Sequence, residues 1–345
     1  MSRKITLLWK LIAKRNVPLR KSDWMRFAVL GAGSYGTAIA THLQNLNLET
    51  VTWNRSSGQS IDDAIANADI LVLGVPAQSM REFLSSIETD LPVINLAKGI
   101  EVTGLKRMSE VVSETLGPNP YAILSGPSFA KDIVAGHPVG LTLASKNKSL
   151  RNQIQSLLSN DVFDVKVSDD VAGVELGGAL KNVFAIGAGM LDGLGCGDSM
   201  AGDWFTRSMV EMRDVGQVLG GKWSTFSGRS GLGDLAITCT ESSRNFRFGR
   251  AFSSSGSIED AIAIAGPTVE GVSTLKAVHS ITQRKGMMTP IIRVLYQTVH
   301  EGSITPSEFL TEIRRLDSKR PKEGTSTGSV VMRRFLPKFW YRRRK

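Results

Sequence analysis

The sequence predicts an α/β protein: an N-terminal, Rossmann-like, doubly wound sheet followed by an all-α C-terminal domain. Short apolar, strand-like segments alternate with helical segments up to about residue 167. From Val171 onward, apolar residues take helical spacing and the strand signals stop. The 345 residues suit two domains. We therefore expect a basic N-terminal extension (1–24), a sheet domain (25–167), a helical domain (168–316) and a basic C-terminal tail (317–345).

The first predicted strand ends in a glycine-rich turn. Apolar Phe27–Leu30 is followed by Gly31, Gly33 and Gly36 in G-x-G-x-x-G spacing, and then by a predicted helix over Thr37–Leu46. In such a turn the first glycine allows the tight bend, the second lets the backbone approach a pyrophosphate, and the third lets helix and strand pack closely. The helix N-terminus then points its amides at the phosphates. The turn therefore predicts dinucleotide binding.

The second predicted strand, Glu49–Trp53, ends without an acidic residue. An Asp or Glu there usually binds the ribose hydroxyls of NAD. Arg55 occupies this region instead, beside Asn54 and several serines. This favours NADP, whose 2′-phosphate suits an arginine, or at least tolerance of NADPH alongside NAD; the alternative is that Arg55 is a solvated loop residue.

Five further strands complete the predicted sheet. The third covers Ile70–Val75, and the fourth lies in 91–99 and ends at Lys98, where ligands bind in such sheets. The fifth ends at Leu124 and leads into a loop over 125–130. The last two lie within 138–145 and 163–170.

One long helix is predicted over residues 171–194, and Glu175, Lys181 and Asn182 interrupt its apolar pattern. A buried lysine needs partners or loses its charge, so Lys181 is a candidate acid or base. The alternative is a lysine whose stem is buried while its ammonium reaches water.

Downstream, glycines at 228, 231 and 233 predict a tight loop. Asp234 follows, and then come Ser243, Arg244 and Asn245, a set that suits a phosphate or carboxylate group. Glu270 lies near the start of another predicted helix, and residues 287–302 read as the final amphipathic helix.

The positive charge lies in the two ends of the chain. The net charge is +10, yet residues 1–25 carry +6, residues 316–345 carry +8, and the body carries −4. No nucleic-acid partner is therefore expected of the body. The basic ends can touch RNA, DNA or anionic lipid, but we favour the interpretation that they are solvated ends. Residues 1–24 could form an interfacial helix, or translation could begin at Met25.

The Cys and His content predicts no metal site. Cys196 and Cys239 allow one disulfide at most, and the four histidines are scattered. A reducing cytoplasm is the expected compartment.

Six motifs together resemble the bacterial-type NAD(P)-dependent glycerol-3-phosphate dehydrogenases from about Met25 to Leu316. They are GAGSYGTAIA, NLAKGIE, LSGPSFAKDI, GALKNVFAIGAGMLDGL, SGLGDLAITCTESSRNFRFG and VEGVST. The resemblance implies reversible, NAD(P)H-dependent reduction of dihydroxyacetone phosphate to sn-glycerol 3-phosphate for phospholipid synthesis, and a possible homodimer.

The resemblance also assigns site residues. It implies Lys181 as general acid/base, with Lys98 and Asp234 completing the catalytic set. It implies that substrate is bound by Lys98, Gly126, Ser128, Lys181, Asp234, Ser243, Arg244 and Asn245. The implied cofactor contacts, with the glycine turn, are Gly31, Gly33, Ser34, Tyr35, Gly36, Arg55, Lys98, Ala130, Arg244 and Glu270.

The residue chemistry agrees with this resemblance. Ketone reduction needs a proton for the developing alkoxide, and no histidine lies in a motif. Burial and Lys98 would lower the pKa of Lys181 toward neutrality, while Asp234 would orient Lys181 and limit that lowering. Lys98 would polarise the substrate oxygen, and Arg244 and Asn245 would hold the phosphate.

The chain departs from the family between Arg55 and Ala68, where it lacks a longer segment, so the adenosine end of the cofactor site would be more open. Tyr35 stands where the family usually has Trp. The β-hydroxyacid and 6-phosphogluconate dehydrogenases are an alternative, but they space lysine and asparagine as K-x-x-x-N, whereas Lys181 and Asn182 are adjacent. A second alternative is a membrane- or RNA-binding protein that acts through its basic tails.

Overall fold

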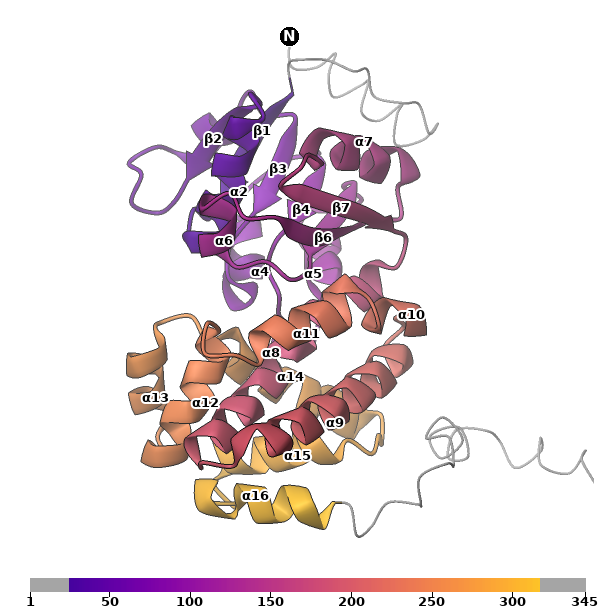
Figure 1. The fold of residues 1–345 in the computed structure, drawn as a ribbon. Helices are drawn as coiled ribbons and strands as arrows, with labels where there is room; N and C mark the ends of the chain where they lie inside the picture. Colours follow the sequence, from indigo (N-terminus) through magenta and orange to yellow (C-terminus); the bar gives the residue numbers. More distant parts are fainter. Residues whose placement is uncertain (1–24, 317–345) are drawn as a thin grey trace, which may run out of the picture.

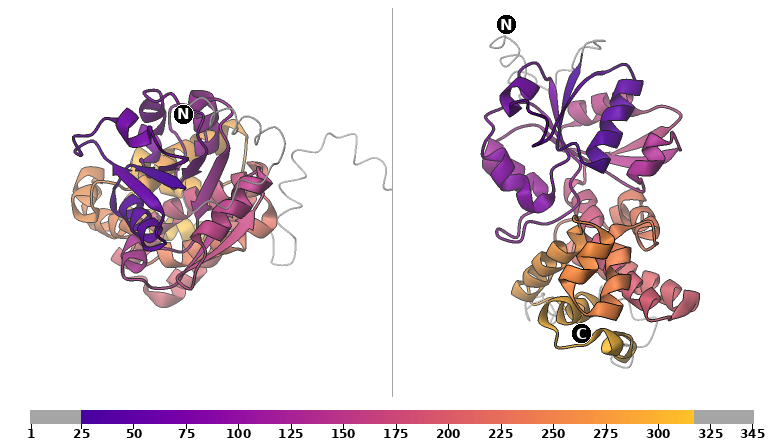
Figure 2. Two further views of the ribbon diagram at one scale, coloured as in Figure 1. Left: turned by 90° about the horizontal axis from the view of Figure 1, so that it is seen from above. Right: turned by 90° about the vertical axis from the view of Figure 1, so that its left-hand side faces the viewer.

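The computed structural model describes residues 25–316, which form two lobes (Figure 1). One lobe holds the whole sheet with its helices, and the other is entirely helical; the side view in Figure 2 separates them clearly. The predicted fold class is confirmed. The predictions for residues 1–24 and 317–345 lie outside the described residues.

The sheet has seven strands in the order β2-β1-β3-β4-β5-β6-β7. Neighbours are parallel except β5 and β6, which are antiparallel. Chain order reverses direction between β1 and β3, and at such a switch point the loops diverge and open a ligand crevice. The strands are β1 (Arg26–Leu30), β2 (Glu49–Trp53), β3 (Ile70–Leu73), β4 (Val93–Asn95), β5 (Tyr121–Ser125), β6 (Val139–Ala144) and β7 (Phe163–Ser168).

Two strands end earlier than the sequence predicts. β3 stops at Leu73 instead of Val75, immediately before Gly74. β4 stops at Asn95, whose side chain accepts from the Ala97 amide (3.0 Å) and donates to the Ala97 carbonyl (3.1 Å). These bonds turn the backbone out of the sheet, so Lys98 lies in a loop beyond the strand.

Helices cover both faces of this sheet. Those on one face, α2 and α7, share a core with the strands through residues such as Ile39 and Ile154. Those on the other face, α3, α4 and α5, bury Leu84 and Val111. The helices of this lobe are α2 (Ser34–Asn45), α3 (Ile61–Ile65), the 3₁₀ turn η1 (Ala77–Ser79), α4 (Met80–Leu84), α5 (Met108–Leu116), α6 (Ala130–Val134) and α7 (Lys148–Leu158). The first begins at Ser34, three residues before the predicted start.

Helix α8 (Val171–Gly193) is the core of the second lobe. It is long and apolar enough to span a membrane by composition, but 94% of its most apolar window is buried inside the protein. Around it lie α9 (Gly197–Val218), α10 (Trp223–Phe226), the π-helical turn η2 (Arg229–Gly233), α11 (Asp234–Thr238), α12 (Arg244–Ser255), α13 (Ile258–Ala265) and α14 (Glu270–Arg284).

Glycines let α8 and α12 approach backbone to backbone. A Cβ at Gly189 of α8 would meet the Phe246 carbonyl oxygen at 1.9 Å, and one at Gly249 of α12 would meet the Ile186 carbonyl oxygen at 1.9 Å. No other residue fits at these two positions without a backbone shift. The crossing fixes the helix that carries Lys181 against the helix that carries Asn245.

The helix predicted over 287–302 is present, but it is not the final one. The structure has α15 (Pro290–Tyr296), then the π-helical turn η3 (Gln297–Glu301), and then Gly302 in the left-handed region (φ 65°). A further helix, α16 (Pro306–Arg315), follows. The left-handed glycine ends the first helix, and a capping box between Thr305 and Glu308 starts the next.

Candidate active site

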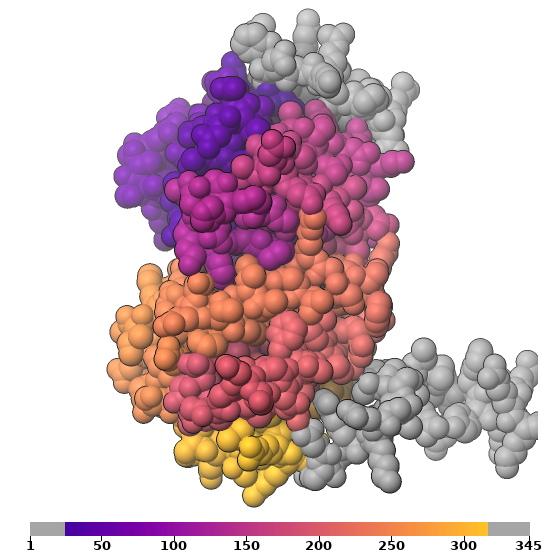
Figure 3. Space-filling view, in the orientation of Figure 1, coloured from indigo at the N-terminus to yellow at the C-terminus, as the bar shows by residue number. Residues whose placement is uncertain are grey.

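A cleft of about 900 Å³ lies between the lobes, beside the loops after β1 and β3. Figure 3 shows the two lobes meeting along one band of the surface. Residues of both lobes line the cleft. Of the predicted site residues it is lined by Gly31, Gly33, Ser34, Tyr35, Gly36, Arg55, Lys98, Ser128, Ala130, Lys181, Ser243, Arg244, Asn245 and Glu270.

The glycine turn is shaped to receive a pyrophosphate. Gly31 has φ 93°, and a Cβ there would meet the Gly74 carbonyl carbon at 2.7 Å. A Cβ at Gly36 would meet the Gly31 oxygen at 2.3 Å, whereas one at Gly33 would meet nothing within 4 Å. The turn is therefore tight on its inner side and open toward the cleft. No acidic residue lies in the first turn of α2 to repel an anion, so these residues fit a dinucleotide.

The adenosine end of the cleft contains Trp53, Arg55 and Phe83. Arg55 is exposed, and within residues 25–316 its guanidinium makes no hydrogen bond or ion pair. Asn54 shapes the loop, because its side-chain oxygen accepts from the Ser56 amide (2.9 Å). The Arg55 guanidinium, just after the second strand, is therefore available to a ligand.

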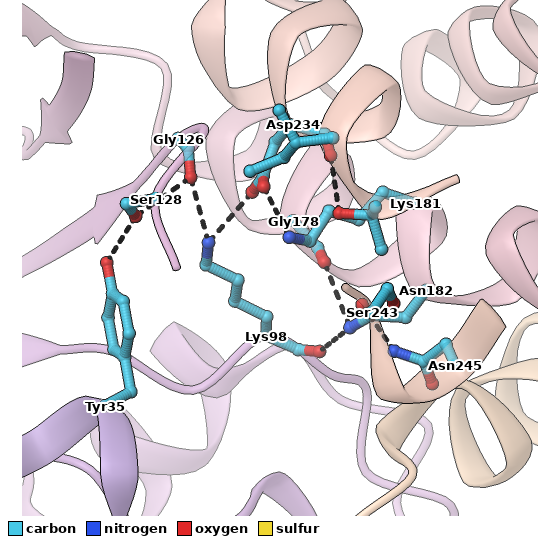
Figure 4. Close-up of polar contacts among 12 residues, drawn as sticks. Tyr35, Lys98, Gly126, Ser128, Gly178, Lys181, Asn182, Asp234, Ser243 and Asn245 are labelled. Atoms are coloured by element: carbon cyan, nitrogen blue, oxygen red, sulfur yellow. Dashed lines mark hydrogen bonds and ion pairs between the residues drawn. The ribbon is translucent and has the colours of Figure 1, made fainter. Parts of the chain in front are cut away.

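Two lysines share one carboxylate at the centre of the cleft (Figure 4). Lys98 Nζ donates to Asp234 Oδ2 (2.8 Å), and Lys181 Nζ donates to Asp234 Oδ1. Lys98 comes from the sheet lobe, while Lys181 and Asp234 come from the helical lobe. Asp234 is fully buried and Lys181 is 7% exposed. Asp234 thus fixes both ammonium groups across the lobe boundary.

The two lysines have different proton affinities. Burial lowers the pKa of Lys181, Asp234 opposes this change, and the positive charge of Lys98 adds to it, so that the pKa is about 7. Burial also disfavours the charge of Lys98, but Asp234 and Tyr35 outweigh it and raise the pKa of Lys98. Lys98 therefore stays charged near neutral pH, while Lys181 can gain or lose a proton.

Gly126 and Asp234 do not line the cleft. Gly126 presents its carbonyl to Lys98 Nζ (3.2 Å), and Asp234 lies behind both lysines. The Gly126 carbonyl accepts from Lys98 and Ser128, and the Asp234 carboxylate accepts from both lysines.

The start of α12 forms the opposite wall of the cleft. Ser243 caps the helix, accepting from the Phe246 amide, and the exposed Arg244 follows it. Asn245 Nδ2 donates to Asn182 Oδ1 (2.9 Å), and Asn245 Oδ1 accepts from the Gly271 amide (2.9 Å). One Asn245 N–H remains available to a ligand.

Sequence reasoning noted Asn182 but missed its contacts. Its Oδ1 accepts from Asn245, and its Nδ2 donates to the Lys98 carbonyl (3.0 Å). The only signal was a polar residue beside Lys181 in an apolar helix. Lys131 was missed altogether: it lines the cleft and donates to Ser242 Oγ (3.0 Å).

Glu270 places a buried acceptor at the cleft. Its Oε1 accepts from the Ala77 amide (3.1 Å), while its Oε2 is buried with no partner among the described residues. Burial raises the pKa of this carboxyl group. A buried unpaired polar atom is costly unless a ligand pairs with it, so Oε2 is free to accept from a ligand.

In the part of the chain that the structure describes, no group of three or more His, Cys, Asp or Glu side chains could hold a metal ion. Cys196 and Cys239 are free thiols.

Comparison with known proteins identifies the family. The sequence model of the NAD-dependent glycerol-3-phosphate dehydrogenase N-terminus matches residues 26–62 and 56–151, and that of the C-terminus matches residues 170–311. The first match is broken in the short segment after β2.

Relatives agree with these matches. A glycerol-3-phosphate dehydrogenase [NAD(P)+] of Thermoanaerobacter is 37% identical over 87% of this chain and 100% of its own length. One from Synechocystis is 35% identical over 84% of this chain and 93% of its own. The crystal structure of glycerol-3-phosphate dehydrogenase from Coxiella burnetii superposes with a TM-score of 0.81, at 29% identity, over 85% of this chain and 99% of its own. The chain therefore belongs to the NAD-dependent glycerol-3-phosphate dehydrogenase family.

Proposed function

We propose that this protein reversibly reduces dihydroxyacetone phosphate to sn-glycerol 3-phosphate with NADPH or NADH. The observation that carries the proposal is the Lys98–Asp234–Lys181 arrangement at the cleft between the lobes. Residues 25–167 act as the cofactor domain and residues 168–316 as the substrate domain. The product would serve phospholipid synthesis in the cytoplasm.

The glycine turn, Tyr35 and Ala130 hold the cofactor's phosphates and nicotinamide end, and Arg55 holds its adenosine end. Glu270 Oε2 would accept from the cofactor, and Arg244 would reach it from the substrate side. The bound cofactor supplies the hydride. Arg55 favours NADPH, because an arginine suits the dianionic 2′-phosphate and nothing among residues 25–316 holds its guanidinium elsewhere.

Lys181 donates the proton to the developing alkoxide, since its pKa of about 7 lets it exchange a proton near neutral pH. Lys98 keeps its charge and stabilises the oxygen as negative charge builds. Asp234 holds both ammonium groups in place, and Gly126 fixes Lys98 through its carbonyl. Asp234 and Gly126 therefore serve the substrate through the lysines.

Arg244, the second N–H of Asn245 and the N-terminus of α12 with Ser243 would bind the substrate's phosphate. Charge-assisted bonds and a helix N-terminus suit a dianion. Ser128 would bind on the other side of the substrate. Binding of the remote phosphate holds the carbonyl against Lys98 and Lys181, which lowers the barrier to reaction.

The test follows nicotinamide absorbance with dihydroxyacetone phosphate and either NADPH or NADH, for wild type and Lys181→Ala. Wild type should turn over and the variant should lose nearly all activity. Undiminished turnover in Lys181→Ala would show that another residue is the general acid. A wild type that binds the cofactor but does not turn over would refute dihydroxyacetone phosphate as the substrate.

We further propose a homodimer and weak membrane association through the basic segments 1–24 and 317–345, whose charges are +6 in residues 1–25 and +8 in residues 316–345. Co-sedimentation with anionic vesicles should weaken when both segments are deleted; equal binding would end that proposal. Light scattering of the full chain measures the oligomer directly.

A further inference from the structure

Tyr35 belongs to the cofactor turn, but its hydroxyl contacts the substrate side of the cleft. Tyr35 lies in the first turn of α2, and its hydroxyl is 2.8 Å from Ser128 Oγ, in the loop after β5 (Figure 4). The two residues are 93 positions apart in the chain. The bond therefore joins two loops that the sheet brings together at its carboxyl edge.

Either hydroxyl can donate in this bond, and the Gly126 carbonyl beside Ser128 favours Tyr35 as the donor. Ser128 has one hydroxyl proton, which it donates to the Gly126 carbonyl (3.2 Å). In this arrangement Tyr35 donates to Ser128. The same Gly126 carbonyl accepts from Lys98 Nζ (3.2 Å). Ser128 is 8% exposed and lines the cleft, so one lone pair remains to accept a bond from a ligand hydroxyl.

The ring of Tyr35 makes a second contact with the substrate side. Lys98 Nζ lies 5.6 Å from the ring centroid, within the range of a cation–π interaction. Tyr35 thus touches Lys98 directly and Ser128 through its hydroxyl. Both partners are groups that we place on the substrate.

We propose that Tyr35 is a positioning residue that couples cofactor binding to substrate binding. Its hydroxyl orients Ser128 to accept from the hydroxyl next to the substrate's carbonyl carbon, and its ring holds Lys98 at the carbonyl oxygen. A cofactor that orders the glycine turn also orders Tyr35, so each ligand tightens the other by the same factor. This inference rests on the proposed function.

The test uses a complex that does not turn over: sn-glycerol 3-phosphate with NADPH, both already reduced. Calorimetric titration gives the affinity for each ligand with and without the other. NADPH should tighten sn-glycerol 3-phosphate binding in wild type. Tyr35→Phe, which keeps the ring, should weaken sn-glycerol 3-phosphate binding in the presence of NADPH by about fivefold and remove most of the coupling. Its affinity for NADPH alone should change less than twofold.

A double-mutant cycle tests whether Tyr35 acts through Ser128. Tyr35→Phe should have little further effect in a Ser128→Ala background, because the hydroxyl then has no partner to orient. Tyr35→Leu, which also removes the ring, should lower kcat for dihydroxyacetone phosphate beyond Tyr35→Phe, since Lys98 loses its support.

Tyr121→Phe is the matched control. The Tyr121 hydroxyl donates to Glu175 Oε1 (2.7 Å), away from the cleft lining. Its removal should lower stability but leave both affinities and the coupling within twofold.

Two results would overturn the inference. In the first, Tyr35→Phe and Ser128→Ala weaken sn-glycerol 3-phosphate binding by factors that multiply in the double variant. In the second, Tyr35→Phe weakens the binding of NADPH and of sn-glycerol 3-phosphate equally. A wild type that neither binds sn-glycerol 3-phosphate nor reduces dihydroxyacetone phosphate would refute the proposed function itself, and the inference with it.

Discussion

At the scale of single residues, the site depends on one carboxylate that serves two ammonium groups. Asp234 cannot neutralise Lys98 and Lys181 equally, because they differ in their other neighbours. Lys98 also contacts the Gly126 carbonyl and the Tyr35 ring, whereas the hydrogen bond of Lys181 within residues 25–316 is to Asp234. The result is one permanent charge and one exchangeable proton within a single cluster.

The lowered pKa of Lys181 predicts opposite pH dependences for the two reaction directions. Reduction needs the protonated amine, so kcat/KM for dihydroxyacetone phosphate should fall about tenfold per pH unit above a pH of about 7. Oxidation needs the neutral amine, so kcat/KM for sn-glycerol 3-phosphate should rise with pH through the same region. Initial rates at saturating cofactor measure both profiles.

Lys181→Met should remove the inflection of both pH profiles near pH 7 and lower kcat by about 10²- to 10⁴-fold. Lys276→Met, at an exposed lysine of α14, is the control and should keep both the rate and the profile. An unchanged inflection in Lys181→Met would assign the titration to another group.

Arg55→Ala should raise KM for NADPH by about 10- to 100-fold, the loss expected for charge-assisted bonds to a phosphate, and leave KM for NADH within twofold. Arg284→Ala, at an exposed arginine of α14, should change neither. Parallel losses with both cofactors would show that Arg55 does not read the 2′-phosphate.

At the scale of elements, the crossing of α8 and α12 sets the distance between the proton donor and the phosphate site. Gly249→Ala would push a methyl group into the Ile186 carbonyl and should lower the free energy of unfolding by about 1–3 kcal/mol. Gly202→Ala in α9, where a Cβ would meet nothing within 4 Å, should raise it by about 0.5–1 kcal/mol. Urea denaturation measures both; equal effects would mean that the crossing tolerates a side chain.

Most of the helices and strands could be predicted from local sequence patterns. The glycine turn, the apolar strands and the long buried helix follow from periodicity and turn chemistry. The helix over 287–302 followed from apolar spacing, but α16 was missed, although its Thr305-Pro306 start is readable in the sequence. The site was harder to predict from the residues alone. Asp234 meets Lys98 across 136 positions and Lys181 across 53, and no local pattern encodes such a meeting.

At the scale of the whole molecule, side-chain bonds join the lobes both near the cleft and beside β6 and β7. Near the cleft, Glu270 accepts from the Ala77 amide. At the other edge, Arg229 of η2 donates to the carbonyls of Leu141 (3.2 Å) and Asp164 (2.6 Å) and pairs with the Asp164 carboxylate. Arg229 thus ties the helical lobe to β6 and β7.

Arg229→Met should lower the free energy of unfolding by about 1–3 kcal/mol, because it leaves two carbonyls without their donor. Asp164→Asn keeps those carbonyl bonds and loses only a solvent-exposed ion pair, so it should cost less than about 1 kcal/mol. Denaturant unfolding of the two variants compares them. Equal losses of unfolding free energy in the two variants would show that the Arg229–Asp164 ion pair, rather than the carbonyl bonds, stabilises this contact.

The Lys98–Asp234 bond also limits which segments can be exchanged between related proteins. Neither the 26–151 segment nor the 170–311 segment encodes a working site, because each carries only part of one three-residue unit. Exchange of these segments between distant relatives would preserve catalysis only if both sides of the bond kept their register. Each half packs around a core of its own, but only the two halves together contain the complete Lys98–Asp234–Lys181 unit.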